Sequence, residues 1–245
     1  MTARFRIILL PGMALLTLTA ADAPAQARLR GDSMAVQAVQ RMLEAIGGRE
    51  RWAAARTLEV EYAGWQVSPR SRAVVERAWR DLRQPVQRID LRGDSLELSW
   101  IFTDARVVRL RGADTTDLTE RMVRRHRTFW RRDFYTLLYR FAIGDSDLEL
   151  QWRAPRTVVV HSDSQGELGW WEIASDGSPV RWGTVDGGRP LEYVYGPMRA
   201  FGALRFPAWG TSVDGSWRFD YVRVELSPRE IPAELLRAAS GERGP

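Results

Sequence analysis

The chain has 245 residues, a formal net charge of +5 and no cysteine. The lack of cysteine excludes disulfides, thiolate nucleophiles, cysteine-based zinc sites and a lipid-modified N-terminal cysteine. All 36 basic residues are arginine, and lysine and asparagine are both absent. Because both missing types use A-rich codons, a GC-rich genome accounts for the bias, and the charge does not indicate a nucleic-acid partner.

The N-terminus has the pattern of a secretory signal peptide. Arg4 and Arg6 precede an apolar run from Ile7 to Ala20, and the small residues Ala25 and Ala27 follow. The run is shorter than the roughly 20 residues that span a bilayer. We therefore expect a signal peptide over 1–27, a soluble periplasmic domain over 28–240 and a disordered tail over 241–245.

The mature chain is predicted to begin with a helix over 32–48. Asp32 and Ser33 are candidate N-caps, Gly47 and Gly48 form a stop, and apolar residues recur between them at helical spacing. A second short helix is expected over 49–56.

Alternating apolar and polar residues then predict two sets of strands with helices between them. The first set is expected over 57–63, 72–81, 86–91, 96–102 and 105–111. A wide apolar stripe predicts a helical region over 115–142. The second set is expected over 148–152, 157–161, 168–173, 180–184, 191–195, 203–207 and 217–226, and the tail is expected to contain a short helix.

These elements predict an α+β fold built on one strongly curved antiparallel sheet. A sheet of about 11 strands twists and coils, so it would form an incomplete β-barrel whose concave face is covered by helices. Trp170 and Trp171 are adjacent on one strand and must point to opposite faces, so Trp182 across the turn can pair with only one of them.

The order of elements resembles the LolA/LolB-like group of bacterial envelope proteins, which includes the lipoprotein-sorting carriers. Three segments have this likeness: AVQRMLEAIGGRERWAAARTLEVEYAGW, ASDGSPVRWGTVDGGRPLEYVYGPMRAFGALRFPAWGT and DYVRVELSPREIPAELLRA. The resemblance implies a half-barrel enclosing an apolar cavity, which receives lipoprotein acyl chains in the sorting carriers. Without a cysteine after the signal, the chain is similar to the soluble carrier and unlike its lipid-modified receptor.

Three chemical alternatives are disfavoured by their sequence context. The string Gly93-Asp94-Ser95-Leu96 is similar to a lipase-type nucleophile motif, but it lies between two predicted strands instead of at a strand-to-helix turn. The two histidines, His126 and His161, are far apart, and His126 is interpreted as a partly buried, hydrogen-bonded residue of the helix. This disfavours a metal site. Stacking of nucleic-acid bases needs a basic groove beside the aromatic residues, which the pattern does not provide.

We therefore expect a non-enzymatic periplasmic protein that binds a lipid or a lipoprotein acyl chain, with no cofactor and no metal. The expected ligand-binding residues are Leu96, Leu98, Trp100 and Phe102 on the concave wall, with Trp130 and Phe134 on the covering helix. The expected partners are a hydrophobic small molecule or a lipidated protein, with transient membrane contact through the arginine-rich stretch 124–132, and the chain is expected to be monomeric. An envelope sensor or protein-interaction module with the same fold is the alternative.

Overall fold

The computed structural model describes residues 28–66, 72–112, 114–153 and 155–239. The predicted signal peptide and the predicted tail over 241–245 lie outside these residues. Within the described ranges, no helix is both long enough and apolar enough to cross a membrane.

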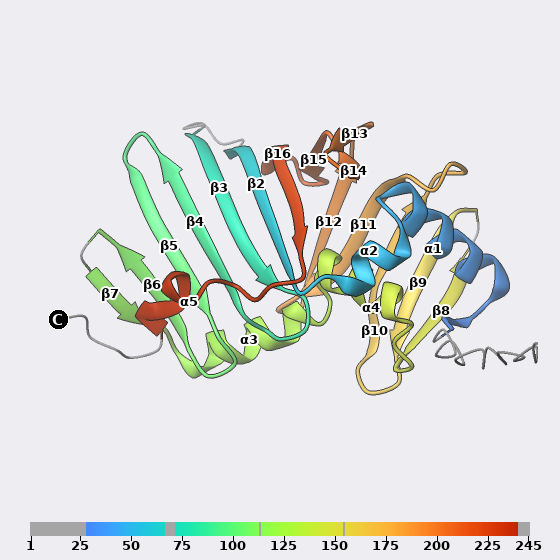
Figure 1. The fold of residues 1–245 in the computed structure, drawn as a ribbon, viewed down its shortest axis with the longest axis horizontal. Helices are drawn as coiled ribbons and strands as arrows, with labels where there is room; N and C mark the ends of the chain where they lie inside the picture. Colours follow the sequence, from blue (N-terminus) through green and yellow to red (C-terminus); the bar gives the residue numbers. More distant parts are fainter. Residues whose placement is uncertain (1–27, 67–71, 113, 154, 240–245) are drawn as a thin grey trace, which may run out of the picture.

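In the described residues, fourteen strands form one large curved sheet, which Figure 1 shows with its strands side by side along the longest axis. The strand order is β1-β8-β9-β10-β11-β12-β15-β16-β2-β3-β4-β5-β6-β7. The edge strands β1 and β7 do not pair with each other, so the sheet is open, as predicted. All neighbours are antiparallel except β1 and β8, which are parallel.

The strands have the following bounds. In the large sheet they are β1 (Arg30–Gly31), β2 (Thr57–Gln66), β3 (Arg72–Asp81), β4 (Gln87–Gly93), β5 (Leu96–Phe102), β6 (Val107–Arg111), β7 (Asp114–Asp117), β8 (Leu148–Arg153), β9 (Thr157–Ser162), β10 (Gly166–Ile173), β11 (Pro179–Asp186), β12 (Arg189–Tyr195), β15 (Trp209–Ser212) and β16 (Trp217–Ser227). A separate hairpin contains β13 (Met198–Phe201) and β14 (Leu204–Pro207). The sheet exceeds the expected 11 strands by the short strands β1, β7 and β15.

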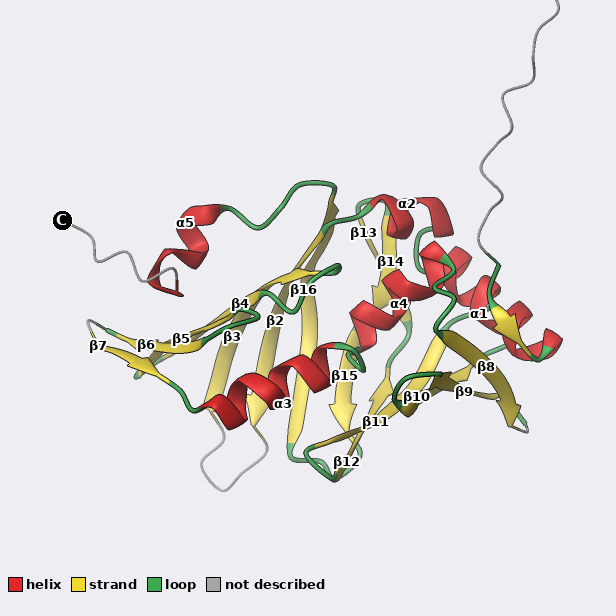
Figure 2. Cartoon of the chain, turned by 90° about the horizontal axis from the view of Figure 1, so that it is seen from below, coloured by secondary structure: helices red, strands yellow, loops and turns green. Residues whose placement is uncertain are grey.

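The helices follow the predicted order, with one break that the sequence pattern did not indicate. They are α1 (Ser33–Ala45), α2 (Arg49–Ala54), α3 (Glu120–Trp130), α4 (Phe134–Ile143), α5 (Ala233–Leu236) and the 3-10 turn η1 (Arg237–Ala239). The predicted helix over 115–142 is divided because Asp133 is the N-cap of α4, where its carboxylate accepts hydrogen bonds from the backbone N–H groups of Tyr135 and Thr136. Thr115 and Thr116 belong to β7 instead. Figure 2 shows α3 and α4 following one another along the sheet.

The main core lies where α1, α2 and α4 pack on the sheet. Met42, Trp52, Leu137 and Phe141 are fully buried in it, together with apolar residues of β2, β8, β9 and β10. The chain has no disulfides. Burial of this apolar surface is therefore the principal contribution to the stability of the fold. The core does not extend to β5 and β6, where a second, small cluster is found.

The second cluster lies on the opposite face of β5 from Trp100 and Phe102. Ile101 and Val108 are fully buried there against Ala239 of the C-terminal segment. Two guanidinium groups hold this segment in place. Arg88 donates to the backbone carbonyl of Leu235 at 2.9 Å, and Arg106 donates to that of Ala239 at 3.1 Å. The C-terminal segment therefore covers part of one face, and leaves Trp100 and Phe102 on the other face only half-buried.

The tryptophan-rich hairpin β10–β11 has one indole on the outer face and two in the core. Trp171 and Trp182 are directly opposite in register, are 0% and 3% exposed, and have ring centroids 6.3 Å apart. Their indole N–H groups have no hydrogen-bond partner among the described residues. Trp170 lies over Gly183, where an added Cβ would be 2.4 Å from the indole, and Arg181 stacks on its ring. As predicted, Trp182 pairs with only one of the two adjacent tryptophans, which is Trp171.

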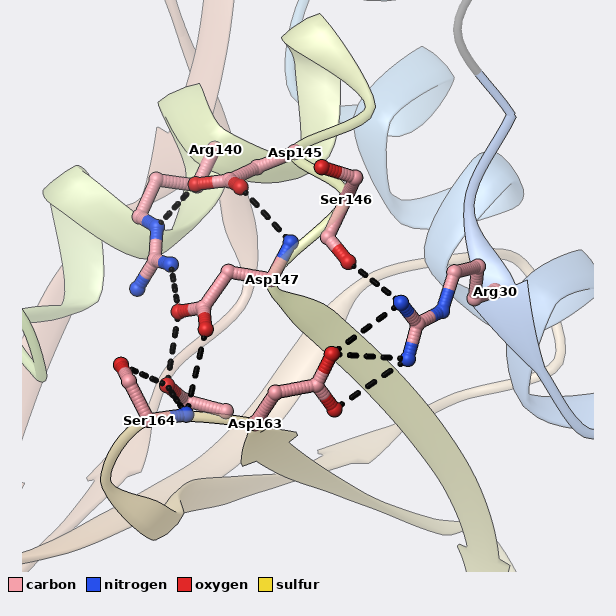
Figure 3. Close-up of polar contacts among 8 residues, drawn as sticks. Arg30, Arg140, Asp145, Ser146, Asp147, Asp163 and Ser164 are labelled. Carbon is pink, nitrogen blue, oxygen red and sulfur yellow. Dashed lines mark hydrogen bonds and ion pairs between the residues drawn. The ribbon is translucent and has the colours of Figure 1, made fainter.

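A polar network fixes the β1 edge of the sheet to the end of α4 (Figure 3). The Arg30 guanidinium pairs with the Asp163 carboxylate at 3.1 Å and donates to the carbonyl oxygen of Ser146 at 2.7 Å. Arg140, near the C-terminus of α4, pairs with Asp145 and Asp147 at 2.6 and 2.8 Å. Arg30 therefore connects the short strand β1 to the segments that follow α4 and β9.

Candidate functional site

A groove of about 330 Å³ lies between α3 and strands β3, β4 and β5. Its apolar walls are half-buried side chains, which lie on one face of the sheet and on the facing side of α3. These residues are Ile89, Leu91, Trp100, Phe102, Met122 and Phe129. The strand register places Ile89 opposite Trp100 and Leu91 opposite Leu98, so the sheet side of the groove forms by cross-strand pairing.

A second cavity of about 200 Å³ adjoins the groove and lies between α4 and the strands around β2. The two cavities share Glu76 and Phe129 in their linings. The second cavity is lined mainly by aromatic rings, from Tyr62, Phe134, Tyr135, Trp182, Tyr193, Tyr195, Trp217, Phe219 and Tyr221, and it also contains Arg80 and Asp133. The two adjoining cavities therefore form an apolar section and an aromatic section, and the aromatic section includes charged groups.

Arg80 is the cation of the aromatic section, and its charge is compensated locally. Its guanidinium donates to Gln87 Oε1 at 2.7 Å and lies 3.7 Å from the Asp133 carboxylate, while Tyr135 packs beneath it. Burial raises the pKa of Asp133, and Arg80 and the two cap hydrogen bonds oppose this shift.

Three tyrosine hydroxyls beside Arg80 form a hydrogen-bonded chain. The Tyr135 hydroxyl lies 2.5 Å from that of Tyr62 and 2.9 Å from that of Tyr221. Burial raises the pKa of all three phenols, so they remain neutral at physiological pH. The chain satisfies these hydroxyls within the protein.

His126 of α3 lies at the edge of the groove as a neutral, hydrogen-bonded side chain. Its Nε2 donates to the carbonyl oxygen of Pro85 at 2.8 Å, its Nδ1 lies 3.5 Å from the Gln87 amide, and its ring packs on Phe102. Burial lowers the pKa of His126 to about 4. The sequence-based interpretation of this histidine as a hydrogen-bonded helix residue is confirmed.

Glu76 occupies the junction of the two cavities. It lies opposite Tyr62 on β2 and Leu91 on β4, so its side chain is on the same face as both. Burial raises the pKa of Glu76, and the positive charge of Arg80 partly opposes this. Among the described residues its carboxylate has no ion pair and no hydrogen bond.

The mouth of the groove is flanked by an arginine-rich surface. The Arg125 guanidinium forms two hydrogen bonds with the Asp186 carboxylate, at 3.0 and 2.6 Å, and both residues also line an outer hollow of about 600 Å³. Arg121, Arg124 and Arg189 line the same hollow. This surface links α3 to the turn between β11 and β12.

The structure places the six predicted site residues in different surroundings. Trp100 and Phe102 line the groove, and Phe134 lines the aromatic section. Leu98 is one cross-strand position beyond the groove, opposite Leu91, and Leu96 is opposite Gly93 near the β4–β5 turn. Trp130 does not line either cavity: it donates from its indole N–H to the backbone carbonyl of Asp81 and lines another hollow beside Leu82.

Sequence reasoning missed the polar groups of the site, chiefly Glu76, Arg80 and the tyrosine chain. Glu76 and Arg80 are on one face of β3 and alternate with Arg77 and Trp79, which contact Glu59 on the other face. The signal that could have found them is two charged residues on one face of a predicted strand, where Glu76 has the register partners Tyr62 and Leu91 and Arg80 has Leu58 and Gln87.

The motifs that suggested other chemistry have structural roles in this fold. Asp94 and Ser95 form the turn between β4 and β5, so the setting differs from the strand-to-helix turn of a hydrolase nucleophile. Within the described ranges, no three histidine, cysteine or carboxylate side chains gather in a way that would hold a metal ion.

Comparison with protein-family models and with curated proteins gives no match. Solved structures do match. A DUF1329 family protein from Desulfovibrio piger has a TM-score of 0.52 and 5% identity, with 85% of this chain and 99% of that chain covered. A LolA superfamily protein from Nitrosomonas europaea has a TM-score of 0.49 and 9% identity, covering 82% and 96%.

A putative outer membrane lipoprotein-sorting protein domain from Vibrio parahaemolyticus has a TM-score of 0.44 and 6% identity, with 84% of this chain and 98% of that chain covered. At such identities the comparisons concern the fold and not the activity. The chain is thus similar in fold to the Desulfovibrio piger protein. The other two structures are described as a LolA superfamily protein and a lipoprotein-sorting domain, which is the group that the sequence resembles.

Proposed function

We propose that the mature protein is a non-enzymatic periplasmic carrier that binds an apolar ligand, a lipid or a lipoprotein acyl chain, in the groove beneath α3. The observation that supports this most directly is the set of half-buried apolar side chains around the 330 Å³ groove. Helices that cover the concave face of a half-barrel would shield such a chain from water. Each methylene that it buries contributes about 0.8 kcal/mol.

Uptake of the neutral probe N-phenylnaphthylamine tests this proposal, together with mass spectrometry of organic extracts from protein purified without detergent. We expect saturable fluorescence enhancement, and we expect Ile89→Trp to reduce it by filling the groove. Val222→Trp is the matched control, because Val222 is exposed and lines a separate hollow. A wild-type protein that neither takes up the probe nor contains co-purified lipid contradicts the proposal.

We also propose that the arginine-rich surface beside the groove makes transient contact with anionic membranes. Arg121 and Arg189 are exposed and have no carboxylate partner among the described residues, whereas Arg124 and Arg125 pair with Glu120 and Asp186. Attraction to anionic headgroups would bring the groove mouth to the membrane and would weaken with salt. Phosphatidylglycerol vesicles should co-sediment the protein, and Arg121→Glu combined with Arg189→Glu should abolish this.

Phosphatidylcholine vesicles and the Arg205→Glu variant are the controls for the membrane experiment. Arg205 is exposed on β14 and does not line either cavity or the arginine-rich hollow. Binding of equal strength to neutral vesicles contradicts a contact based on charge.

A further inference from the structure

Among the described residues, Glu76 is the charged side chain of the two adjoining cavities that has neither an ion pair nor a hydrogen bond. Arg125 pairs with Asp186, Arg80 lies beside Asp133 and Gln87, and burial keeps His126 neutral by lowering its pKa. No comparable partner contacts the Glu76 carboxylate in the described part of the chain. Glu76 is half-buried, and a carboxylate that faces a cavity without an ion pair can accept a cation from outside.

The surroundings of Glu76 suit a cation that is also lipophilic. Phe129 lines both cavities with Glu76, and Tyr62 lies directly opposite it on β2. In the aromatic section, Tyr193 stacks with Trp182 and meets Phe219 edge-on. Aromatic ring faces are electronegative and attract ammonium groups, most strongly where water is excluded.

The apolar section begins next to the same carboxylate. Leu91 is the cross-strand neighbour of Glu76, and Ile89, Trp100 and Phe102 continue the wall along β4 and β5. A chain placed along this wall would have its head at Glu76. We propose that the ligand is a cationic amphiphile, a long-chain amine or quaternary ammonium compound, whose head pairs with Glu76 among the aromatic rings.

This inference rests on the proposed function, because it names the head group of the ligand that the groove binds. Arg80 would favour the opposite class, an anionic head, since its Nε is buried and has no partner among the described residues. However, Asp133 and Gln87 already neutralise and solvate that guanidinium, whereas the Glu76 carboxylate has neither kind of partner. The charge of the site therefore favours a cation.

Displacement of bound N-phenylnaphthylamine by three amphiphiles with the same chain length tests the head group. Dodecyltrimethylammonium, dodecanol and dodecanoate are compared at concentrations below micelle formation. We expect dodecyltrimethylammonium to bind roughly tenfold more tightly than dodecanol, and dodecanoate to bind more weakly than both. In Glu76→Gln the advantage of the cation over the alcohol should disappear while dodecanol binding is retained.

Glu97→Gln is the matched control. Glu97 is exposed on β5 and alternates with Leu96 and Leu98, so it lies on the opposite face from the groove. It should retain the preference for the cation.

The outcomes separate the two proposals. If the three compounds displace the probe equally well, or dodecanoate binds best, the cationic head is wrong while the apolar groove stands. If the wild-type protein binds neither the probe nor dodecanol, the groove proposal itself fails. The comparison of the three compounds on the wild-type protein decides the head group even if Glu76→Gln does not fold.

Discussion

Two adjacent tryptophans on β10 have opposite environments, so their substitution should have unequal effects. Trp171 is fully buried against Phe134, Phe141 and Trp182, whereas Trp170 is on the outer face over Gly183. Trp171→Ala should lower the free energy of unfolding by about 3–5 kcal/mol, and Trp170→Ala by about 1 kcal/mol. Urea denaturation measures both. Equal losses would show that the assignment of faces in this hairpin is wrong.

His126 should make the protein less stable in mild acid. Its pKa is about 6.5 when unfolded but about 4 in the folded protein, because burial disfavours its charged form. Between these pH values the unfolded chain binds more protons, so the free energy of unfolding falls as the pH decreases from about 6.5 to about 4. The total contribution is about 3 kcal/mol.

Chemical denaturation between pH 7 and pH 4 measures the effect of His126, with His126→Gln as the comparison. Glutamine does not titrate, so the free energy of unfolding of the variant should fall by about 3 kcal/mol less than that of the wild-type protein over this pH range. Parallel pH profiles of the two proteins would show that His126 does not have a lowered pKa in the folded protein. NMR titration of the two histidines provides a direct second measurement.

At the scale of elements, the break between α3 and α4 depends on one carboxylate with two roles. Asp133 caps α4 and also lies 3.7 Å from the Arg80 guanidinium. Asp133→Ala removes both interactions and should cost about 3–5 kcal/mol, since it leaves a buried cation without its carboxylate. Asp133→Asn retains a side-chain oxygen for the cap, so it should be about 1 kcal/mol more stable than the alanine variant. Equal stability of the two variants in urea would exclude the capping role.

Sequence patterns predicted the helices and strands that are long enough to show a regular spacing of apolar residues. They missed the shortest strands, which are too short to show one. Strands such as β2 and β10 show alternation and end at polar turns, whereas β1 and β15 have two and four residues, too few for a period to appear. The division at Asp133 was missed because the apolar stripe continues across it from Phe129 to Phe134. Because only a few residues separate α3 from α4, the apolar residues on the two sides of Asp133 keep nearly helical spacing.

Local sequence patterns do not contain the parts of the candidate site that depend on contacts distant in sequence. Alternation predicted that Trp100 and Phe102 lie on one face of β5. It did not predict that Ile101, on the opposite face, is the most buried residue of that strand. The reason is the C-terminal segment around Ala239, which packs on the opposite face. The junction at Glu76 likewise requires the strand register and the position of α3, which local patterns do not contain.

At the scale of the whole molecule, the helical core is concentrated at one end of the sheet. The fully buried side chains of α1, α2 and α4 lie over β8 to β11 and β2, whereas β4 and β5 face the groove with half-buried side chains. Regions with fewer buried apolar contacts open more easily. The groove end should therefore be the less stable part of the molecule when no ligand is bound.

Hydrogen exchange with and without ligand tests this uneven stability. Amides of β4, β5 and α3 should exchange faster than those of β9 and β10 in the free protein. Adding dodecyltrimethylammonium should slow exchange in the first group, because a bound chain fills the groove and joins α3 to the sheet, and it should leave β9 and β10 unchanged. Slowing that is uniform over the sheet would indicate global stabilisation instead, and protection confined to β9 and β10 would place the ligand at the helical core.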